Sequence, residues 1–229
     1  MPRTALLPVA KHTAAAPRPA SSSERVADAI TKGLMRRDYS VGQRLVEVEL
    51  TAQFQVGRST VREALKSLAA NGVVELVPHR GAVIRGLSLG DARNLLAVLE
   101  VLTGLAARLA AERIEIGRHR AQFSAAAKPL VAPRAANERG KLLDQRAGFY
   151  QAIFDIAGSD DLNRAMPTWR AHLFRSQVQP HLTPTDLRAM VAEYRQIIDA
   201  VLDGDGERAE AVTRKHLQKS GERSLPHLR

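Results

Sequence analysis

The sequence predicts a mainly α protein, in which an N-terminal winged helix-turn-helix (three helices and a β-hairpin) is followed by an all-helical bundle of about six helices. Two observations carry this prediction. Before residue 86, three segments with apolar residues at helical spacing precede two short β-rich runs joined by a turn. After residue 86, apolar residues recur at helical spacing between proline and glycine breaks.

Composition limits the class of protein. The chain of 229 residues is long enough for two domains, and it has no cysteine, which excludes disulfides, thiolate metal sites and cysteine nucleophiles. The net charge of +10 favours a polyanionic partner. No run approaches the roughly 18 apolar residues of a membrane span, and Pro8, Lys11 and Pro17 interrupt the apolar start where a signal peptide would continue. We therefore expect a soluble, cytoplasmic protein without a membrane partner.

The N-terminal segments are predicted from composition and helix caps. Residues 1–20 are rich in alanine and proline, with three cations and no acid, which predicts a disordered basic arm. The first domain is expected over residues 21–86. It begins with three serines and Glu24, whose capping chemistry predicts a helix to about Arg37. A second helix over residues 47–55 follows the turn at Gly42, and its expected buried side consists of Val48, Leu50 and Phe54.

Residues 56–71 predict the helix around which the first domain is organised. Four apolar residues lie on one face of it: Val61, Ala64, Leu65 and Leu68. The first turn and a half, where free N–H groups and the macrodipole favour an anion, holds Arg58, Ser59, Thr60 and Arg62. Arginines that can fork onto a guanine edge or a phosphate, on a helix anchored from behind, indicate a recognition helix in the major groove of double-stranded DNA. The alternative is an ordinary amphipathic helix with a solvated basic tip.

A β-hairpin is predicted directly after this helix. Residues 73–77 and 82–84 are the two β-rich runs, and the Asn71-Gly72 pair before them suits a left-handed helix cap. The turn between the runs carries His79, Arg80 and Gly81, which can reach a minor groove or a phosphate. For the same turn, a solvated tip without DNA contact is the alternative.

The second domain is expected over residues 87–229. Ser88 caps a long apolar helix, and Thr183 with Pro184 begins a later one. A loosely patterned helical stretch reaches about residue 128, and a proline-bounded break follows. The expected helices cover residues 88–112, 137–157, 159–178, 183–204 and 206–221.

Specific motifs in the first half resemble a known family. Residues 41–45 (VGQRL), the pair Glu49-Leu50, residues 56–65 (VGRSTVREAL), Leu68, Gly72 and the pair Arg80-Gly81 resemble the DNA-binding domain of GntR-family transcription regulators. The resemblance covers about residues 24–86. It implies that the arginines and hydroxyls of the third helix contact operator DNA, together with His79 and Gly81 of the wing.

The second half is similar to the helical effector-binding domain of the FadR subfamily, often called FCD. The matching segments include residues 104–113 (GLAARLAAER) and residues 197–216 with their Gly204-Asp205 turn. Many members of this subfamily hold a divalent metal with an Asp and a His four apart on one helix and a His from each of the last two helices. The corresponding positions here are Arg146, Tyr150, Tyr194 and His216. Because a guanidinium repels a cation and only one imidazole remains, we predict no metal and no cofactor.

This departure suggests a different chemistry for the same positions. An arginine fixed inside a bundle can hold a carboxylate in place of a metal, with Tyr150, Tyr194 and His216 donating hydrogen bonds. We therefore expect these residues and Arg146 to bind an organic acid or an acyl-type metabolite, on a site closed by the helix of Trp169, Arg170 and Arg175. The alternative is that Arg146 pairs internally with an acid and the other three side chains simply pack.

Together these features predict a ligand-responsive DNA-binding transcription regulator. We expect a repressor that binds a palindromic operator as a homodimer and is released by its effector. An enzyme fused to a DNA-binding domain is one alternative, but no Gly-x-Ser-x-Gly elbow, Walker loop or His-Glu-x-x-His motif occurs, so we expect no enzymatic activity. A ligand-independent DNA-coating protein is the other.

Overall fold

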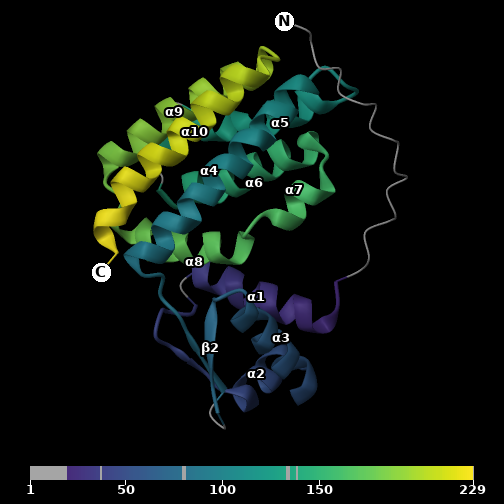
Figure 1. Cartoon of the computed structure of the whole chain (residues 1–229), viewed down its shortest axis with the longest axis vertical. Helices are drawn as coiled ribbons and strands as arrows, with labels where there is room; N and C mark the ends of the chain where they lie inside the picture. Colours follow the sequence, from purple (N-terminus) through teal and green to yellow (C-terminus); the bar gives the residue numbers. More distant parts are fainter. Residues whose placement is uncertain (1–19, 37, 79–80, 133–134, 138, 229) are drawn as a thin grey trace, which may run out of the picture.

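The computed structural model describes residues 20–36, 38–78, 81–132, 135–137 and 139–228. In Figure 1 a small winged helix-turn-helix lies below a larger helical bundle, and the α1 helix and the α8 helix lie side by side where the two meet. The elements of the lower part are α1 (Ser22–Arg36), β1 (Arg44–Leu45), α2 (Glu47–Phe54), α3 (Arg58–Ala70), β2 (Val74–Val77) and β3 (Gly81–Ile84).

Local signals explain where the first helices begin and end. The hydroxyl of Ser21 accepts a hydrogen bond from the N–H of Glu24, and the Glu24 carboxylate accepts one from the N–H of Ser21, which confirms the predicted cap of α1. The turn between α2 and α3 uses the left-handed residue Gln55 (φ 54°) and an extended Gly57 as the N-cap of α3. Gly72, at φ 69°, follows the end of α3 as predicted.

The sheet has one strand more than predicted. Its order is β1-β3-β2 with antiparallel pairing, and Arg44 lies opposite Val83 while Leu45 lies opposite Ala82. The two residues of β1 are too few to show a strand period, so only their pairing with β3 reveals them. Gly81 is required at this junction, because a Cβ there would lie 2.2 Å from the carbonyl oxygen of Leu45 at a φ of 87°.

The buried side predicted for α2 was partly wrong. Leu50 is buried, but the Val48 side chain is 58% exposed. Residues two apart on a helix point about 200° apart, so Val48 cannot share the face of Leu50. Apolar residues two apart, such as Val48 and Leu50, therefore do not indicate one face of a helix.

The C-terminal part contains seven α-helices among the described residues. The helix predicted over residues 159–178 is in fact two, because Pro167 cannot continue the helix that Ser159 caps. The last helix ends at Ser224 rather than at Gly221. The α-helices are α4 (Leu89–Glu112), α5 (His119–Ala127), α6 (Arg139–Ala157), α7 (Asp160–Ala165), α8 (Thr168–Val178), α9 (Pro184–Leu202) and α10 (Gly206–Ser224). Short 3-10 turns are η1 (Lys128–Val131), η2 (Ala135–Asn137), η3 (Gln179–His181) and η4 (Leu225–His227).

The α4 helix is the central element of the bundle, and it packs against α6, α9 and α10. It begins at a capping box formed by Ser88 and Asp91, as the sequence predicted. By length and composition this helix is apolar enough to cross a membrane, but half of its most apolar stretch is buried inside the bundle, as in the core helix of a folded domain. Its outer face keeps Val98, Val101 and Leu105 exposed.

One apolar core extends from the winged helix into the bundle. Ile30 and Leu34 of α1 belong to the same cluster of buried residues as Leu173 and Phe174 of α8. A second cluster fills the upper bundle around Phe123, Phe149 and other apolar residues of α4, α6 and α9. Because α1 and α8 share one core, a shift of α8 would displace α1.

Candidate functional site

The predicted recognition helix presents its polar residues to the outside. Val61, Ala64, Leu65 and Leu68 of α3 are all buried, so this face fixes the helix to the domain. On the opposite face, Arg58, Ser59 and Arg62 are exposed and Thr60 is half-buried. The structure thus brings the four predicted contact residues together at one free end of α3.

A hollow of about 670 Å³ lies between α3 and the sheet. The cations Arg44, Arg62 and Lys66 line it. The Nε of Arg62 donates to Glu47 at 2.9 Å, and the Arg62 side chain is 62% exposed. Because a surface ion pair of this kind contributes only about 0–1 kcal/mol, the guanidinium can exchange its partner for a phosphate or a base edge.

The tip of the wing is only partly described. His79 and Arg80 lie outside the described residues, so their predicted DNA contact remains a prediction. Gly81 is described, and the close approach that it allows is to the Leu45 carbonyl within the domain.

The four residues predicted to bind the effector lie in one cluster in the bundle. Arg146 and Tyr150 are one turn apart on α6, and the Cζ of Arg146 lies 5.4 Å from the centre of the Tyr150 ring. Tyr194 of α9 lies near both Tyr150 of α6 and His216 of α10. Its ring centre is 6.4 Å from that of Tyr150 and 4.9 Å from that of His216. Three helices therefore contribute to one polar group inside an apolar bundle.

Polar atoms in this cluster are buried without partners. Arg146 Nε, both tyrosine hydroxyls and His216 Nε2 are shielded from solvent and have no hydrogen-bond partner of normal geometry among the described residues. The guanidinium of Arg146 nevertheless lies close to both hydroxyls: burial alone would lower the pKa of Arg146, but Tyr194 and Tyr150 raise it. Burial raises the pKa of Tyr150 and of Tyr194, so both hydroxyls keep their protons and can donate. Since buried polar groups are normally paired, these atoms are available to hydrogen-bond a polar ligand.

A buried ionic network fixes the orientation of His216. Glu193 accepts a hydrogen bond from Nδ1 of His216 at 2.6 Å and a two-pronged pair from Arg223 at 2.7 and 2.9 Å. Burial alone would raise the pKa of Glu193, but the hydrogen bonds from His216 and Arg223 lower it to about 2. The ionised carboxylate can only accept, so the proton of the imidazole lies on Nδ1.

The imidazole itself is neutral. Burial lowers the pKa of His216, although Glu193 opposes the shift. Its Nε2 therefore presents a lone pair to the cluster and accepts a hydrogen bond. The expectation from the sequence that His216 donates a hydrogen bond there is therefore wrong, because it did not include Glu193. Glu193 lies one residue before Tyr194 and belongs to no recognisable motif.

The α8 helix adds two further residues that were not assigned to this site. Arg175 lies within electrostatic range of Arg146 and of both tyrosines, and His172 lies one turn before it. Burial, Arg175, Arg146 and Lys32 of α1 lower the pKa of His172 to about 4. The sequence had placed Arg175 on the covering helix, but no spacing rule connects α8 to α6, so only the packing shows that the two meet.

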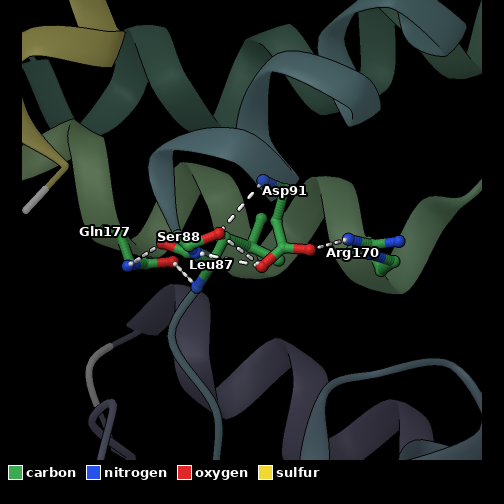
Figure 2. Close-up of polar contacts among 5 residues, drawn as sticks. All are labelled: Leu87, Ser88, Asp91, Arg170 and Gln177. Carbon is green, nitrogen blue, oxygen red and sulfur yellow. Dashed lines mark hydrogen bonds and ion pairs between the residues drawn. The ribbon is translucent and has the colours of Figure 1, made fainter.

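The α8 helix also packs against α1 and contacts the linker at Leu87, between β3 and α4, and Figure 2 shows its contacts with this linker and with Asp91 of α4. The Gln177 amide accepts from the N–H of Leu87 at 2.8 Å and donates to its carbonyl at 3.4 Å. Arg170 pairs with Asp91 at 3.4 Å. In addition, Trp169 Nε1 donates to Asp28 of α1 at 3.1 Å. One helix thus contacts the linker and the first domain, and it places Arg175 within electrostatic range of the polar cluster.

Comparisons with known proteins agree with both halves of this arrangement. Residues 22–84 match the family described as bacterial regulatory proteins, gntR family, and residues 94–219 match the FCD domain. The HTH-type transcriptional repressor RspR of Escherichia coli is 27% identical over 199 residues, which cover 82% of this chain and 85% of that protein. The HTH-type transcriptional regulator LutR of Bacillus subtilis is 29% identical over 198 residues, covering 77% and 89%. Among solved structures, E. coli McbR/YncC has the same fold, with a TM-score of 0.75 at 17% identity over 88% of this chain and 95% of that one.

Proposed function

This chain belongs to the GntR family of bacterial regulatory proteins and carries an FCD domain, and from this premise we propose that it is a repressor that binds a palindromic operator as a dimer and is released by a small organic acid. Its family and its named relatives are transcription regulators, not enzymes. The observation that carries the DNA-binding part is the α3 helix, whose exposed Arg58 and Arg62 stand on a fully buried apolar face. We also infer that the protein works in the cytoplasm, because its proposed partner is DNA.

Selection from a random double-stranded DNA library tests the operator proposal. We expect an inverted repeat to be enriched, since two recognition helices related by a twofold axis read the same half-site twice. Binding that retains no sequence preference after several rounds would favour the DNA-coating alternative. Enrichment of a single asymmetric half-site would contradict the dimer.

The dimer proposal rests on the outer face of α4. Val98, Val101 and Leu105 are 48%, 52% and 39% exposed, and their spacing places them in one stripe on the most apolar helix of the chain. Contiguous exposed apolar residues of this kind mark an interface. A second copy of the chain is the partner that a palindromic operator requires.

A charge placed in this stripe is expected to separate the two subunits. Val101→Glu buries a carboxylate without a partner in the proposed interface, so sedimentation velocity should show a monomer where the wild type sediments as a dimer. The control is Ala125→Glu, which introduces the same charge at an exposed position of α5. A Val101→Glu protein that remains dimeric would place the interface elsewhere.

The effector part of the proposal rests on the cluster of Arg146, Tyr150, Tyr194 and His216. Its donors suit a carboxylate, and α8 connects it to α1 and the linker. An effector can shift the DNA-binding domains only if it binds one arrangement of α8 better than the other. Because Arg175 of α8 interacts electrostatically with the cluster and α8 packs against α1, this helix gives that difference a physical route.

A further inference from the structure

Arg146 has a second arginine close to it, and neither has an acidic partner among the described residues. Arg175 Nε donates to the backbone carbonyl of Ala171 at 3.1 Å, and no ion pair joins Arg146 or Arg175 to a carboxylate in the described part of the chain. Glu193, the buried acid of this region, is already held by His216 and Arg223. Two half-buried guanidinium groups therefore lie near one cluster without a carboxylate partner among the described residues.

The two arginines repel each other electrostatically. Burial and the nearby charge of Arg146 lower the pKa of Arg175 to about 9, so both groups remain charged at neutral pH. Lys32 of α1 adds a third positive charge on the side of His172. A buried cation without a partner costs free energy, and one negative charge would balance only one of the two arginines.

The neutral His216 adds a further requirement. Its Nε2 is buried and unpaired, and it can only accept a hydrogen bond. Carboxylates and phosphates that are fully ionised have no proton to give. A hydroxyl on the ligand supplies the donor that this atom lacks.

We propose that Arg146 and Arg175 together bind a small hydroxylated dianion, either a hydroxydicarboxylate or a hydroxylated phosphate monoester, with its hydroxyl on His216 Nε2. The tyrosine hydroxyls of Tyr150 and Tyr194 donate to the anionic groups. This inference rests on the proposed effector site and extends it with Arg175 of α8 and with the charge of the ligand. The attraction between the bound anion and Arg175 also draws α8, the helix that contacts α1, toward the ligand.

Isothermal titration with four probes tests the proposal on the full-length protein. The probes are malate, succinate, glycerol 3-phosphate and propionate, in a buffer free of phosphate and carboxylates. We expect malate or glycerol 3-phosphate to bind at least about tenfold more tightly than propionate, because a charge-assisted hydrogen bond to a second anionic group contributes about 1.5–3 kcal/mol. Whichever of malate and glycerol 3-phosphate binds more tightly shows whether the site prefers a dicarboxylate or a phosphate ester. Succinate, which lacks the hydroxyl, should bind more weakly than malate.

Variants of Arg175 show whether this residue binds the second negative charge of the ligand. Arg175→Met should bring the affinity for the dianion down to that for propionate, and Arg175→Lys should restore part of the difference. Arg188→Gln, which removes an exposed charge on α9, is the matched control and should bind like wild type. The melting temperature without ligand reports folding, and Arg175→Met should change it little, because the substitution removes a half-buried charge that has no acidic partner among the described residues.

Three outcomes overturn the proposal: no binding of any probe at millimolar concentration, binding of malate and of glycerol 3-phosphate that is no tighter than that of propionate, or unchanged dianion selectivity in Arg175→Met. Operator binding, measured by gel shift in the same preparations, is independent of these outcomes. If the dianion binds but leaves operator affinity unchanged, the dianion site stands and the effector role of the proposed function fails.

Discussion

Replacing Arg62 with alanine is expected to weaken operator binding by about 10- to 100-fold, which corresponds to a loss of about 1–3 kcal/mol. The side chain is 62% exposed and pairs with Glu47 at the edge of the hollow beside α3, so its removal leaves the core of the domain intact. Fluorescence anisotropy with the selected operator, at one fixed salt concentration, measures the loss. Circular dichroism should show an unchanged fold.

The salt dependence of binding separates the two kinds of contact that Arg62 can make. If the guanidinium meets a phosphate, the slope of log affinity against log salt decreases by about 0.9, and all DNA sequences are affected alike. If it meets a base edge, discrimination is lost at one operator position. Lys215→Ala is the control, since it removes one exposed positive charge from α10. Equal affinity of Arg62→Ala and Lys215→Ala would reject the assignment of α3 as the recognition helix.

Replacing Glu193 with glutamine is expected to lower the free energy of unfolding by about 3 kcal/mol, within the range found when one partner of a buried ion pair is removed. The Glu193 side chain is only 8% exposed and holds both His216 and Arg223. The substitution keeps the size of the side chain but leaves the cation of Arg223 without its partner. Thermal unfolding should show a loss of roughly 10 °C for a chain of this length.

The pH dependence of stability identifies the cause of this loss. The pKa of Glu193 is lowered to about 2 in the folded protein, so the unfolded chain binds more protons at acidic pH. The stability from this carboxylate is therefore present above its ordinary pKa of about 4.3 and is lost as the pH falls toward 2. In Glu193→Gln this part of the acid dependence should disappear. Glu222→Gln, at an exposed position of α10, should keep it, and an acid dependence that is the same in both variants would contradict the role of Glu193.

The sequence determined the parts of this protein that depend on neighbours along the chain. The caps at Ser21, Ser88 and Thr183, the period of α3 and the positions of Arg58 and Arg62 on its free end follow from residues within one or two turns. The pairing of Arg146 with Tyr150 on α6 is of the same kind, because residues four apart share a helix face. Both family resemblances rest on such local patterns and on the order of the two domains.

Only the tertiary structure decided which distant elements meet. It pairs β1 with β3, brings Arg175 and His172 of α8 to Arg146 of α6, and joins Glu193 to His216. It also leaves part of the apolar residues of α4 on the surface, although the same helix forms the core. These outcomes depend on how helices far apart in the chain pack, and a helical period says which face is apolar but not which helix will cover it.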